Sequence, residues 1–510
     1  MSRRSTLRAR RRQTAGAGLR QSPFCRYENP YPPFEILSAD HVEAIHEASL
    51  EILKSIGINF LLDEARRVLK AAGADIDPDS TRVRFERGLI LDAVSKAPSA
   101  FGISARNPEH SLHFGGRSIN FAAVSSPPNA SDLERGRRSG NFQDFCDFLK
   151  LTQSVNVAQI VSGHAVEPVD IDTSIRHLVA TRAMIEFTDK IFRLYSLGRQ
   201  RVLDVLEMAK IARGFDDDQL ARDPSVFTMV NSNSPLQYDV PMLWGMIELA
   251  LRNQPVVVTP FTLAGAMAPV TLAGALAQQN AEALAGMAFC QIVNPGAPVM
   301  YGGFTSNVDM KSGAPAFGTP EYAKATLIGG QLARRYGVPY RSSNVNASNA
   351  PDAQAAYESQ MALWSSVLGH AHMIHHGLGW LEGGLCASFE KFIIDTEMVQ
   401  MMTELLKPVE VNPDTLALDA IREVGPGGHF FGAAHTLERY ETAFYPPMLS
   451  DWRNFESWNE AGAEDATRRA HRIFKSMLAQ YEPPPLEDSV REALNVFVEK
   501  RIVEGGAPVN

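Results

Sequence analysis

Ile119-Asn-Phe-Ala-Ala-Val124 is a short apolar run that favours a β-strand, and Phe142–Gln153 after it has the apolar spacing of an amphipathic helix. This order of apolar run and helical segment repeats along the chain to about residue 405. Strands are predicted at Ile119–Val124, Val157–Ser162, Ile191–Ser196, Val226–Val230, Val256–Pro260, Val299–Phe304, Tyr340–Ser343 and Met373–Gly377. Helices are predicted at Phe142–Gln153, Ser174–Phe187, Arg201–Arg213, Val240–Leu251, Val270–Val293, Pro320–Tyr336, Asp352–Leu368 and Phe389–Leu405.

Strands that alternate with helices indicate a parallel sheet and the α/β class. Eight such units between residues 118 and 406 fit a (β/α)8 TIM barrel, which typically needs about 250 residues. The competing fold is a doubly wound open sheet, which usually has a glycine-rich turn after its first strand. Val124-Ser-Ser-Pro-Pro-Asn129 is not such a turn, so the barrel is the predicted fold.

The rest of the chain divides into three further parts. Residues 1–34 form a basic tail that we expect to be disordered, because the first twenty residues hold seven arginines and no acid. Residues 35–117 are an N-terminal α+β segment, in which Ser38 caps an amphipathic helix. Residues 407–510 are a helical C-terminal extension that we expect to pack on the barrel at residues 118–406.

The composition of the 510 residues indicates which partners and which cell compartment to expect. The net charge is −9 although the tail is basic, so the body is acidic and nucleic acid is not the expected partner. The longest apolar run, Val270–Val293, contains Gln278, Asn280 and Glu282, which would be costly in lipid, so a buried helix is predicted instead of a membrane span. The four cysteines lie far apart and predict a reduced compartment. We therefore expect a cytoplasmic protein, and a homo-oligomer.

The rim of such a barrel is where chemistry is expected, because active sites of TIM barrels lie at the C-terminal ends of the strands. His376 and Glu382 follow the eighth strand and are predicted as a catalytic pair, since a carboxylate can orient and charge an imidazole. Ordinary hydrogen-bonded histidines are the simpler alternative. The predicted substrate-binding residues at the same rim are Tyr195, Phe304, Asn307, Asp309, Asn346, Gln354, Tyr357 and Trp380.

Two of these groups have a purely structural alternative. Asn307-Val-Asp309 followed by Gly313 is also typical of a capped turn, and Asn349 with Asp352 is typical of a helix start. A metal site is not predicted. His370 and His372 precede the strand, His375 and His376 would point to opposite faces of it, and zinc needs three or four converging ligands.

Several long motifs occur in one order along the chain and resemble the trimethylamine methyltransferase family, in its branch without pyrrolysine that includes enzymes demethylating glycine betaine. The motifs are Asp309-Met-Lys-Ser-Gly-Ala-Pro315, Pro351-Asp-Ala-Gln-Ala-Ala-Tyr-Glu358, Ile374-His-His-Gly-Leu-Gly-Trp-Leu-Glu-Gly-Gly-Leu385, Ser388-Phe-Glu-Lys391, Gly425-Pro-Gly-Gly-His-Phe-Phe-Gly432, His435-Thr436 and Tyr445-Pro-Pro-Met-Leu-Ser-Asp451. The resemblance implies a TIM barrel that moves a methyl group from an amine to the cobalt of a corrinoid held by a separate small protein, with no metal of its own.

One departure from the family bears on the substrate. The archaeal trimethylamine enzymes carry pyrrolysine, whose position we expect near Asn344–Gln354, and this sequence has only ordinary residues there. A quaternary amine already carries its charge and leaves as a neutral tertiary amine, so it needs no captured adduct. Such a substrate is predicted, with glycine betaine as the type. Aromatic candidates for its methyl groups are Tyr195, Phe261, Phe304, Tyr357 and Trp380, and candidate donors for a carboxylate are Asn307, Asn346, Gln354 and His376.

Three alternatives remain open at the level of sequence. The enzyme could demethylate trimethylamine or another methylamine. It could be a barrel enzyme of another reaction class, such as a hydrolase or lyase, which would turn over without any corrinoid protein. It could also be a non-catalytic quaternary-amine binding protein, which would bind glycine betaine without transferring a methyl group.

Overall fold

A computed structural model describes residues 21–508 of the chain. Most of the predicted basic tail therefore lies outside the described residues. Residues 21–34, which the sequence places in that tail, instead lie against the barrel. β1 (Tyr27–Glu28) pairs antiparallel with the first barrel strand, and the buried Asn29 donates from Nδ2 to the carbonyl of Val367 over 2.8 Å.

Eight parallel strands form a closed barrel, which confirms the predicted fold. The last strand pairs with the first, Met373 opposite Asn120, and this pairing closes the ring. All eight strands coincide with the predicted runs, although β10, β11, β14 and β16 are shorter. They are β7 (Ser118–Ala123), β10 (Ile160–Val161), β11 (Ile191–Leu194), β12 (Val226–Val230), β14 (Val256–Val258), β16 (Val299–Gly302), β19 (Tyr340–Ser343) and β20 (Met373–Leu378).

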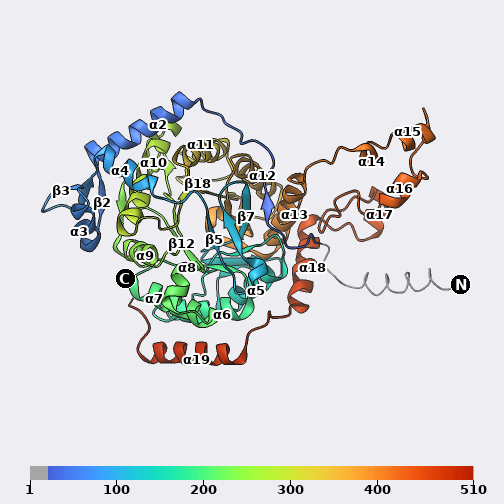
Figure 1. The fold of residues 1–510 in the computed structure, drawn as a ribbon. Coiled ribbons are helices and arrows are strands. Elements are labelled where there is room, and N and C mark those ends of the chain that lie inside the picture. Colours follow the sequence, from blue (N-terminus) through green and yellow to red (C-terminus); the bar gives the residue numbers. More distant parts are fainter. Residues whose placement is uncertain (1–20, 509–510) are drawn as a thin grey trace.

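An outer ring of helices surrounds the strands (Figure 1). Each predicted helix is present within a few residues, and α8 (Asp217–Arg222) is one helix that the sequence analysis did not predict. The ring consists of α5 (Phe142–Ser154), α6 (Arg176–Phe187), α7 (Arg199–Arg213), α9 (Val240–Leu251), α10 (Leu272–Val293), α11 (Pro320–Tyr336), α12 (Ala353–Leu368) and α13 (Phe389–Leu405). No helix within residues 21–508 combines the length and apolar character needed to cross a membrane.

The polar residues of α10 are buried inside the protein and have hydrogen-bond partners there. Glu282 is fully buried and accepts hydrogen bonds from Ser234 Oγ over 2.6 Å and from the amide of Leu236 over 2.8 Å. Buried polar groups are tolerated when they are satisfied in this way. The expectation that Val270–Val293 contains a buried helix is therefore confirmed.

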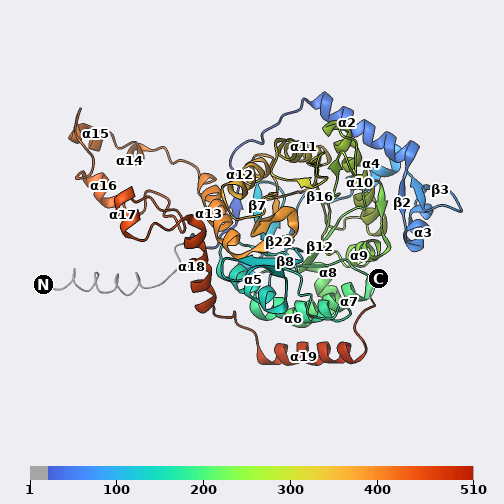
Figure 2. The ribbon, with the colours of Figure 1, turned by 180° about the vertical axis from the view of Figure 1, so that it is seen from behind.

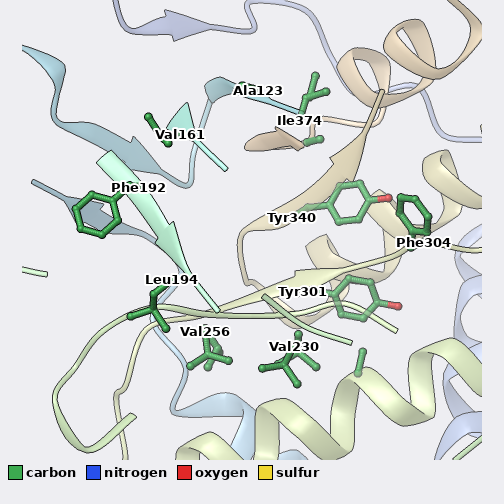
Figure 3. Packing of buried hydrophobic residues seen from close by; sticks show 14 of the residues in the cluster. Ala123, Val161, Phe192, Leu194, Val230, Val256, Tyr301, Phe304, Tyr340 and Ile374 are labelled. Carbon is green, nitrogen blue, oxygen red and sulfur yellow. The ribbon is translucent and has the colours of Figure 1, made fainter. Parts of the chain in front are cut away.

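Side chains alternate across the barrel wall. Phe192, Leu194, Val230 and Val256 face outward into the layer between strands and helices (Figure 3). Their neighbours Ile191, Phe227, Val257, Met300 and Met373 face inward and pack on a hairpin of β5 (Phe101–Ile103) and β6 (Leu112–Phe114). The hairpin thus closes the bottom of the barrel with apolar side chains.

The N-terminal segment packs on one flank of the barrel. Ser38 caps α2 (Ala39–Glu51) as predicted, accepting from the amide of His41 over 3.3 Å. Helix α2 continues into the π-helical turn η1 (Ile52–Ile56), and α2 and α4 pack against α10. The remaining elements of the segment are α3 (Asp63–Ala71), α4 (Arg87–Ser95), β2 (Ile58–Phe60), β3 (Asp75–Ile76), β4 (Arg82–Arg84) and η2 (Pro108–His110). The barrel contributes β13 (Gln237–Tyr238), which pairs with β2.

The C-terminal extension has two parts. An arm with α14 (Pro413–Leu416), α15 (Leu418–Val424), α16 (Ala434–Arg439) and α17 (Phe455–Glu460) projects away from the barrel (Figures 1 and 2). The chain then returns, so that α18 (Ala466–Ala479) packs on α13 and α5, and α19 (Asp488–Val503) packs on α6 and α7. The glycine-rich stretch Gly425–Gly432 lies in the arm between α15 and α16.

Short strands lie at the open end of the barrel. They form one small sheet above β14 and β16 and a second one above β20 and β7. Their bounds are β15 (Leu263–Ala264), β17 (Ser306–Val308) and β18 (Pro315–Ala316) in the first, and β8 (Asn129–Asp132), β9 (Gly136–Ser139), β21 (Trp380–Leu381) and β22 (Cys386–Ser388) in the second, with the turn η3 (Glu382–Gly384) between β21 and β22.

Candidate active site

A cavity of about 280 Å³ opens at the C-terminal ends of the strands. This volume is near the lower end of the range for small-molecule sites, about 300–1,000 Å³. The cavity is lined by Ser125, Ser126, Arg193, Met229, Asn231, Thr259, Phe261, Phe304, Arg341, His375, His376, Trp380, Gly383 and Gly384. The end of the barrel that the sequence identifies as the site is therefore the end that is hollow.

The lining follows from the period of two along each strand. In β11, Ile191 faces the barrel floor and Arg193 lines the cavity two residues later. In β12, Phe227 packs in the floor, while Met229 and Asn231 line the cavity above it. The lower layer of inward side chains is thus apolar and the upper layers carry the polar groups.

His375 and His376 both line the cavity, so the prediction that they point to opposite faces is wrong. His376 has a φ of 54°, in the left-handed region, and the register of β20 against β7 shifts between Ile374 and Leu378. Such a bulge re-aims a side chain out of the strand alternation. The two imidazole centroids lie 3.9 Å apart.

Both histidines are neutral at physiological pH. Burial lowers the pKa of each imidazole well below its ordinary value, and the positive charges of Arg341 and Arg193 lower it further. Nδ1 of His376 and both nitrogens of His375 have no hydrogen-bond partner within residues 21–508. The pair can accept or donate hydrogen bonds to a ligand, but neither ring is a cation.

One wall of the cavity is aromatic. The Trp380 ring lies 3.9 Å from the His376 ring and 6.2 Å from that of Phe304, centroid to centroid. Phe304 in turn lies 5.3 Å from Phe261. Phe304 follows β16 and Trp380 follows β20, so the fold brings these two predicted residues together across β19. Their rings meet edge to face and provide an apolar wall with π faces.

The backbone of Trp380 is held in place from outside the cavity. Asn346 is fully buried and donates from Nδ2 to the Trp380 carbonyl over 2.7 Å, so it supports the aromatic wall and does not line the cavity. Glu382 also lies outside the lining. Its carboxylate is bound by Arg137, with Nε 2.8 Å from Oε2, and it is not paired with His376 as the sequence analysis proposed.

Four other predicted residues lie away from the cavity. Asp309 is exposed and accepts from the amide and hydroxyl of Ser312 over 3.1 and 2.6 Å, which is the capped-turn alternative. Asn307 accepts from Thr319 Oγ1 over 3.1 Å beside that turn. On α12, Gln354 is exposed and donates to Glu358 over 2.9 Å, while the Tyr357 side chain is 63% exposed.

Tyr195 lies beside the cavity and shapes its wall indirectly. Its hydroxyl is 3.1 Å from Ser125 Oγ and 2.8 Å from Ser126 Oγ, and its ring lies 4.4 Å from the guanidinium of Arg193. Tyr195 therefore fixes three lining side chains from the outside.

Arg193 and Arg341 are charged lining residues that were not predicted from the sequence. They lie within β11 and β19, one layer below the strand ends. An arginine at an inward position of an otherwise apolar strand, as in Ile191-Phe-Arg-Leu-Tyr195, is the signal that could have identified them. They bring two positive charges to a cavity whose lining contains no carboxylate.

Groups with metal-ligand geometry lie elsewhere in the protein. Within residues 21–508, such a group is formed by Glu43, His46 and Glu47 on α2. Arg335 binds the Glu43 carboxylate over 2.7 Å and Arg87 pairs with Glu47. These acids already have cationic partners, and the group is not part of the cavity.

Comparison with known proteins identifies relatives over almost the whole chain. Residues 3–506 match the family described as trimethylamine methyltransferase. The glycine betaine methyltransferase of Desulfitobacterium hafniense (strain Y51) is 36% identical over 476 residues, 93% of this chain and 98% of that protein. The trimethylamine methyltransferase MttB of Desulfitobacterium hafniense (strain DSM 10664 / DCB-2) is 29% identical over 477 residues, 92% and 94% of the two chains.

A solved structure shares the fold at much lower sequence identity. The monomethylamine methyltransferase MtmB of Methanosarcina barkeri aligns with a TM-score of 0.50 at 9% identity. The alignment covers 89% of this chain and 90% of that one.

Proposed function

This chain belongs to the trimethylamine methyltransferase family, and on that premise we propose that it transfers a methyl group from a quaternary amine of the glycine betaine type to the reduced cobalt of a corrinoid. The corrinoid is carried by a separate protein and supplies the nucleophile. The 36% identity to a glycine betaine methyltransferase over 98% of that protein supports the choice of substrate.

The observation that carries the proposal is a cavity wall with aromatic side chains and no carboxylate. The titratable lining residues are two histidines, whose pKa values lie well below the ordinary value, and two arginines. A quaternary amine leaves as a neutral tertiary amine and needs no proton. Trimethylamine at neutral pH is an N–H cation, which calls for an anionic hydrogen-bond acceptor, and the lining contains no carboxylate.

In this reaction the protein mainly orients the amine. Trp380 and Phe304 present their rings to the cationic methyl groups, and each good cation–π contact contributes about 0.5–2 kcal/mol. Holding the amine with one methyl group toward the mouth converts a collision into an aligned transfer. The apolar floor formed by the hairpin excludes water from below.

The size of the cavity supports a separate cofactor carrier. About 280 Å³ admits a small amine but is far too small for a corrin macrocycle, so the corrinoid has to be presented at the mouth. Because reduced cobalt needs a reducing compartment, we propose that the protein acts in the cytoplasm. We also propose that the protein forms a homo-oligomer. The exposed aromatic residues of the arm support this, since Phe431 is 85% and Phe444 79% exposed.

The test uses purified protein, reduced cobalamin and a set of amines, with methylation of cobalamin followed by its absorbance. Glycine betaine, proline betaine, carnitine, choline and trimethylamine are compared at equal concentration. We expect transfer from at least one betaine to exceed that from trimethylamine by tenfold or more. Transfer from trimethylamine alone would contradict the proposal, and saturable betaine binding without transfer would indicate a binding protein.

A further inference from the structure

Arg193 and Arg341 line the cavity without a carboxylate partner. Within residues 21–508, no carboxylate oxygen lies within 4.0 Å of either guanidinium, and Nε of each has no hydrogen-bond partner. Arg193 donates from Nη1 to Ser125 Oγ over 3.0 Å. Arg341, only 2% exposed, has a long contact of 3.5 Å to the Gly303 carbonyl.

Other cations of this protein are satisfied by acids or by backbone carbonyls, as for the buried Lys190, which donates from Nζ to three carbonyls over 2.7–2.8 Å. Arg138 donates to both oxygens of Asp144 over 2.6 and 3.0 Å, and Lys391 pairs with Asp395. Glu167 is the acid whose charge acts on Arg193, but its carboxylate contacts His164 at 3.0 Å and Arg176 at 3.7 Å. The two cavity arginines are therefore left with donor capacity that the protein does not use.

Two unpaired guanidiniums make the cavity strongly positive. Burial, and secondarily the neighbouring Arg193, lower the pKa of Arg341 to about 10, so it remains protonated at neutral pH. A buried charge without a counter-charge is costly, and a bare quaternary cation that enters this cavity would add to the repulsion. A ligand that brings a carboxylate removes both costs, since arginine binds carboxylates through two parallel hydrogen bonds.

The geometry points to Arg341 and Arg193 as the binding site for the substrate carboxylate, with Trp380 and Phe304 at the methyl groups. The guanidinium of Arg341 lies 5.2 Å from the centroid of Phe304, so the anionic and the aromatic subsites are adjacent. Such spacing fits a short zwitterion in which about one carbon separates ammonium and carboxylate. The inference rests on the proposed function and names its substrate class: short betaines, in preference to choline and other bare cations.

The first test compares ligands on the unchanged protein by titration calorimetry. Glycine betaine, its methyl ester and choline share the trimethylammonium group, and only the first carries a carboxylate. We expect glycine betaine to bind at least tenfold more tightly than either of the others. We also expect 3,3-dimethylbutyrate, which keeps the carboxylate and replaces nitrogen by carbon, to compete with it. Equal or tighter binding of the ester or of choline would overturn the inference.

The second test changes the arginine. Arg341→Met should weaken glycine betaine binding at least tenfold, while choline binding stays the same or becomes tighter because one repelling charge is gone. A merely structural role would weaken both ligands alike, and that result would overturn the inference. Arg213→Met is the matched control: it removes a largely buried guanidinium that binds Asp223 over 3.1 Å, outside the cavity lining, and should leave the ratio unchanged.

The outcomes separate this inference from the proposed function. Calorimetry needs no cobalamin, so carboxylate-dependent binding without methyl transfer would refute the function and leave the arginine site intact. Methyl transfer from glycine betaine with unchanged selectivity in Arg341→Met would refute only the arginine site. If circular dichroism shows that Arg341→Met does not fold, the ligand series on the unchanged protein decides.

Discussion

Gly384 sets the position of the Trp380 ring. Its φ is 98°, which L side chains rarely adopt, and a Cβ added there would lie 2.5 Å from Cη2 of Trp380. The neighbouring Gly383 also has a positive φ, of 60°, but its Cβ would meet only Phe317 at an ordinary 3.5 Å. Both glycines of the Leu381–Leu385 motif line the cavity, but only Gly384 lies directly against the Trp380 ring.

Gly384→Ala should therefore displace the indole and weaken use of the quaternary amine, raising its KM by roughly tenfold, the loss of about one cation–π contact. Gly337→Ala, at the end of α11 and outside the cavity lining, is the matched control, since it carries a similar backbone cost of about 1–2 kcal/mol without the clash. Steady-state methyl transfer and thermal unfolding of both variants check this. Equal KM values in the two variants would remove Trp380 from the substrate site.

His372 illustrates how a buried neutral histidine affects stability. Nδ1 accepts from the Tyr340 amide over 2.9 Å and Nε2 lies 3.2 Å from the Gly116 carbonyl, an arrangement that suits the neutral ring. Burial lowers its pKa to about 4. Between pH 6.5 and 4 the unfolded chain binds this proton and the folded chain does not, so the free energy of unfolding falls as pH decreases through that window.

We expect the contribution of His372 to the free energy of unfolding, measured with urea, to be constant above about pH 7. It should decline on acidification from about pH 6.5. In His372→Gln, which keeps an acceptor and a donor without a titrating ring, the decline between pH 6.5 and 4.5 should be shallower. The comparison is made at matched ionic strength. A decline of the same slope in both proteins would show that His372 does not titrate as described.

At the residue scale, the predicted side chains that line the cavity follow a strand end, and the lining arginines that were not predicted lie one layer deeper. His376, Trp380 and Phe304 were identified because they stand at or just beyond the ends of β20 and β16. Arg341 was missed because it lies inside β19, where a polar residue was not sought. Asp309 and Gln354 were proposed because their residue types suit a ligand, and local turns and helix contacts account for them instead.

At the scale of elements, strand positions were predictable because apolar runs of five or six residues separated by helical periods have few alternative packings. The bulge in β20 was not predictable, since nothing in Ile374-His-His-Gly377 marks a positive φ at His376. It depends on the tertiary pairing with β7 and on the turn that leads to Trp380. The bulge decides that both histidines face the cavity.

Helix α13 supports that turn through a buried ion pair. Lys391 and Asp395 are both fully buried and pair with each other, and Asp395 Oδ2 also accepts from the Gly379 amide over 2.8 Å, immediately before Trp380. Burial raises the pKa of Asp395 and lowers that of Lys391, and the partner charge opposes each shift. The pair thus ties the helix to the strand that carries the aromatic wall.

Lys391→Met should cost about 3–5 kcal/mol in the free energy of unfolding, because it leaves Asp395 buried without a counter-charge. Adding Asp395→Asn should recover part of that loss, since the amide oxygen can still accept from Gly379 and no charge remains. Urea unfolding of Lys391→Met, of Asp395→Asn and of the double variant measures this. A double variant as unstable as the sum of the two single changes would show that the residues are not coupled.

At the scale of the whole molecule, the arm exposes apolar side chains that nothing in a single chain covers. The large apolar side chains Val409, Phe431 and Phe444 are 85%, 85% and 79% exposed. Monomeric proteins rarely expose so many large apolar groups together. The sequence predicted helices here, but it gave no indication that the segment leaves the barrel, because a projecting arm and a packed extension have the same local periodicity.

We expect the purified protein to be a homo-oligomer in which the arm is covered by a second copy. Light scattering after size exclusion should give a multiple of 56.0 kDa, and Phe431→Glu with Phe444→Glu should lower the mass. Val503→Glu is the control, since Val503 is 87% exposed on α19, outside the arm. A monomer in the unchanged protein would contradict the proposed assembly.

The most direct measurement of the central claim follows the methyl group itself. The protein is incubated with reduced cobalamin and glycine betaine whose three N-methyl groups carry deuterium, and the products are analysed by mass spectrometry. The account predicts one trideuteromethyl group on cobalamin for each molecule of dimethylglycine formed. Dimethylglycine without labelled cobalamin, or labelled cobalamin only when trimethylamine replaces glycine betaine, would contradict it.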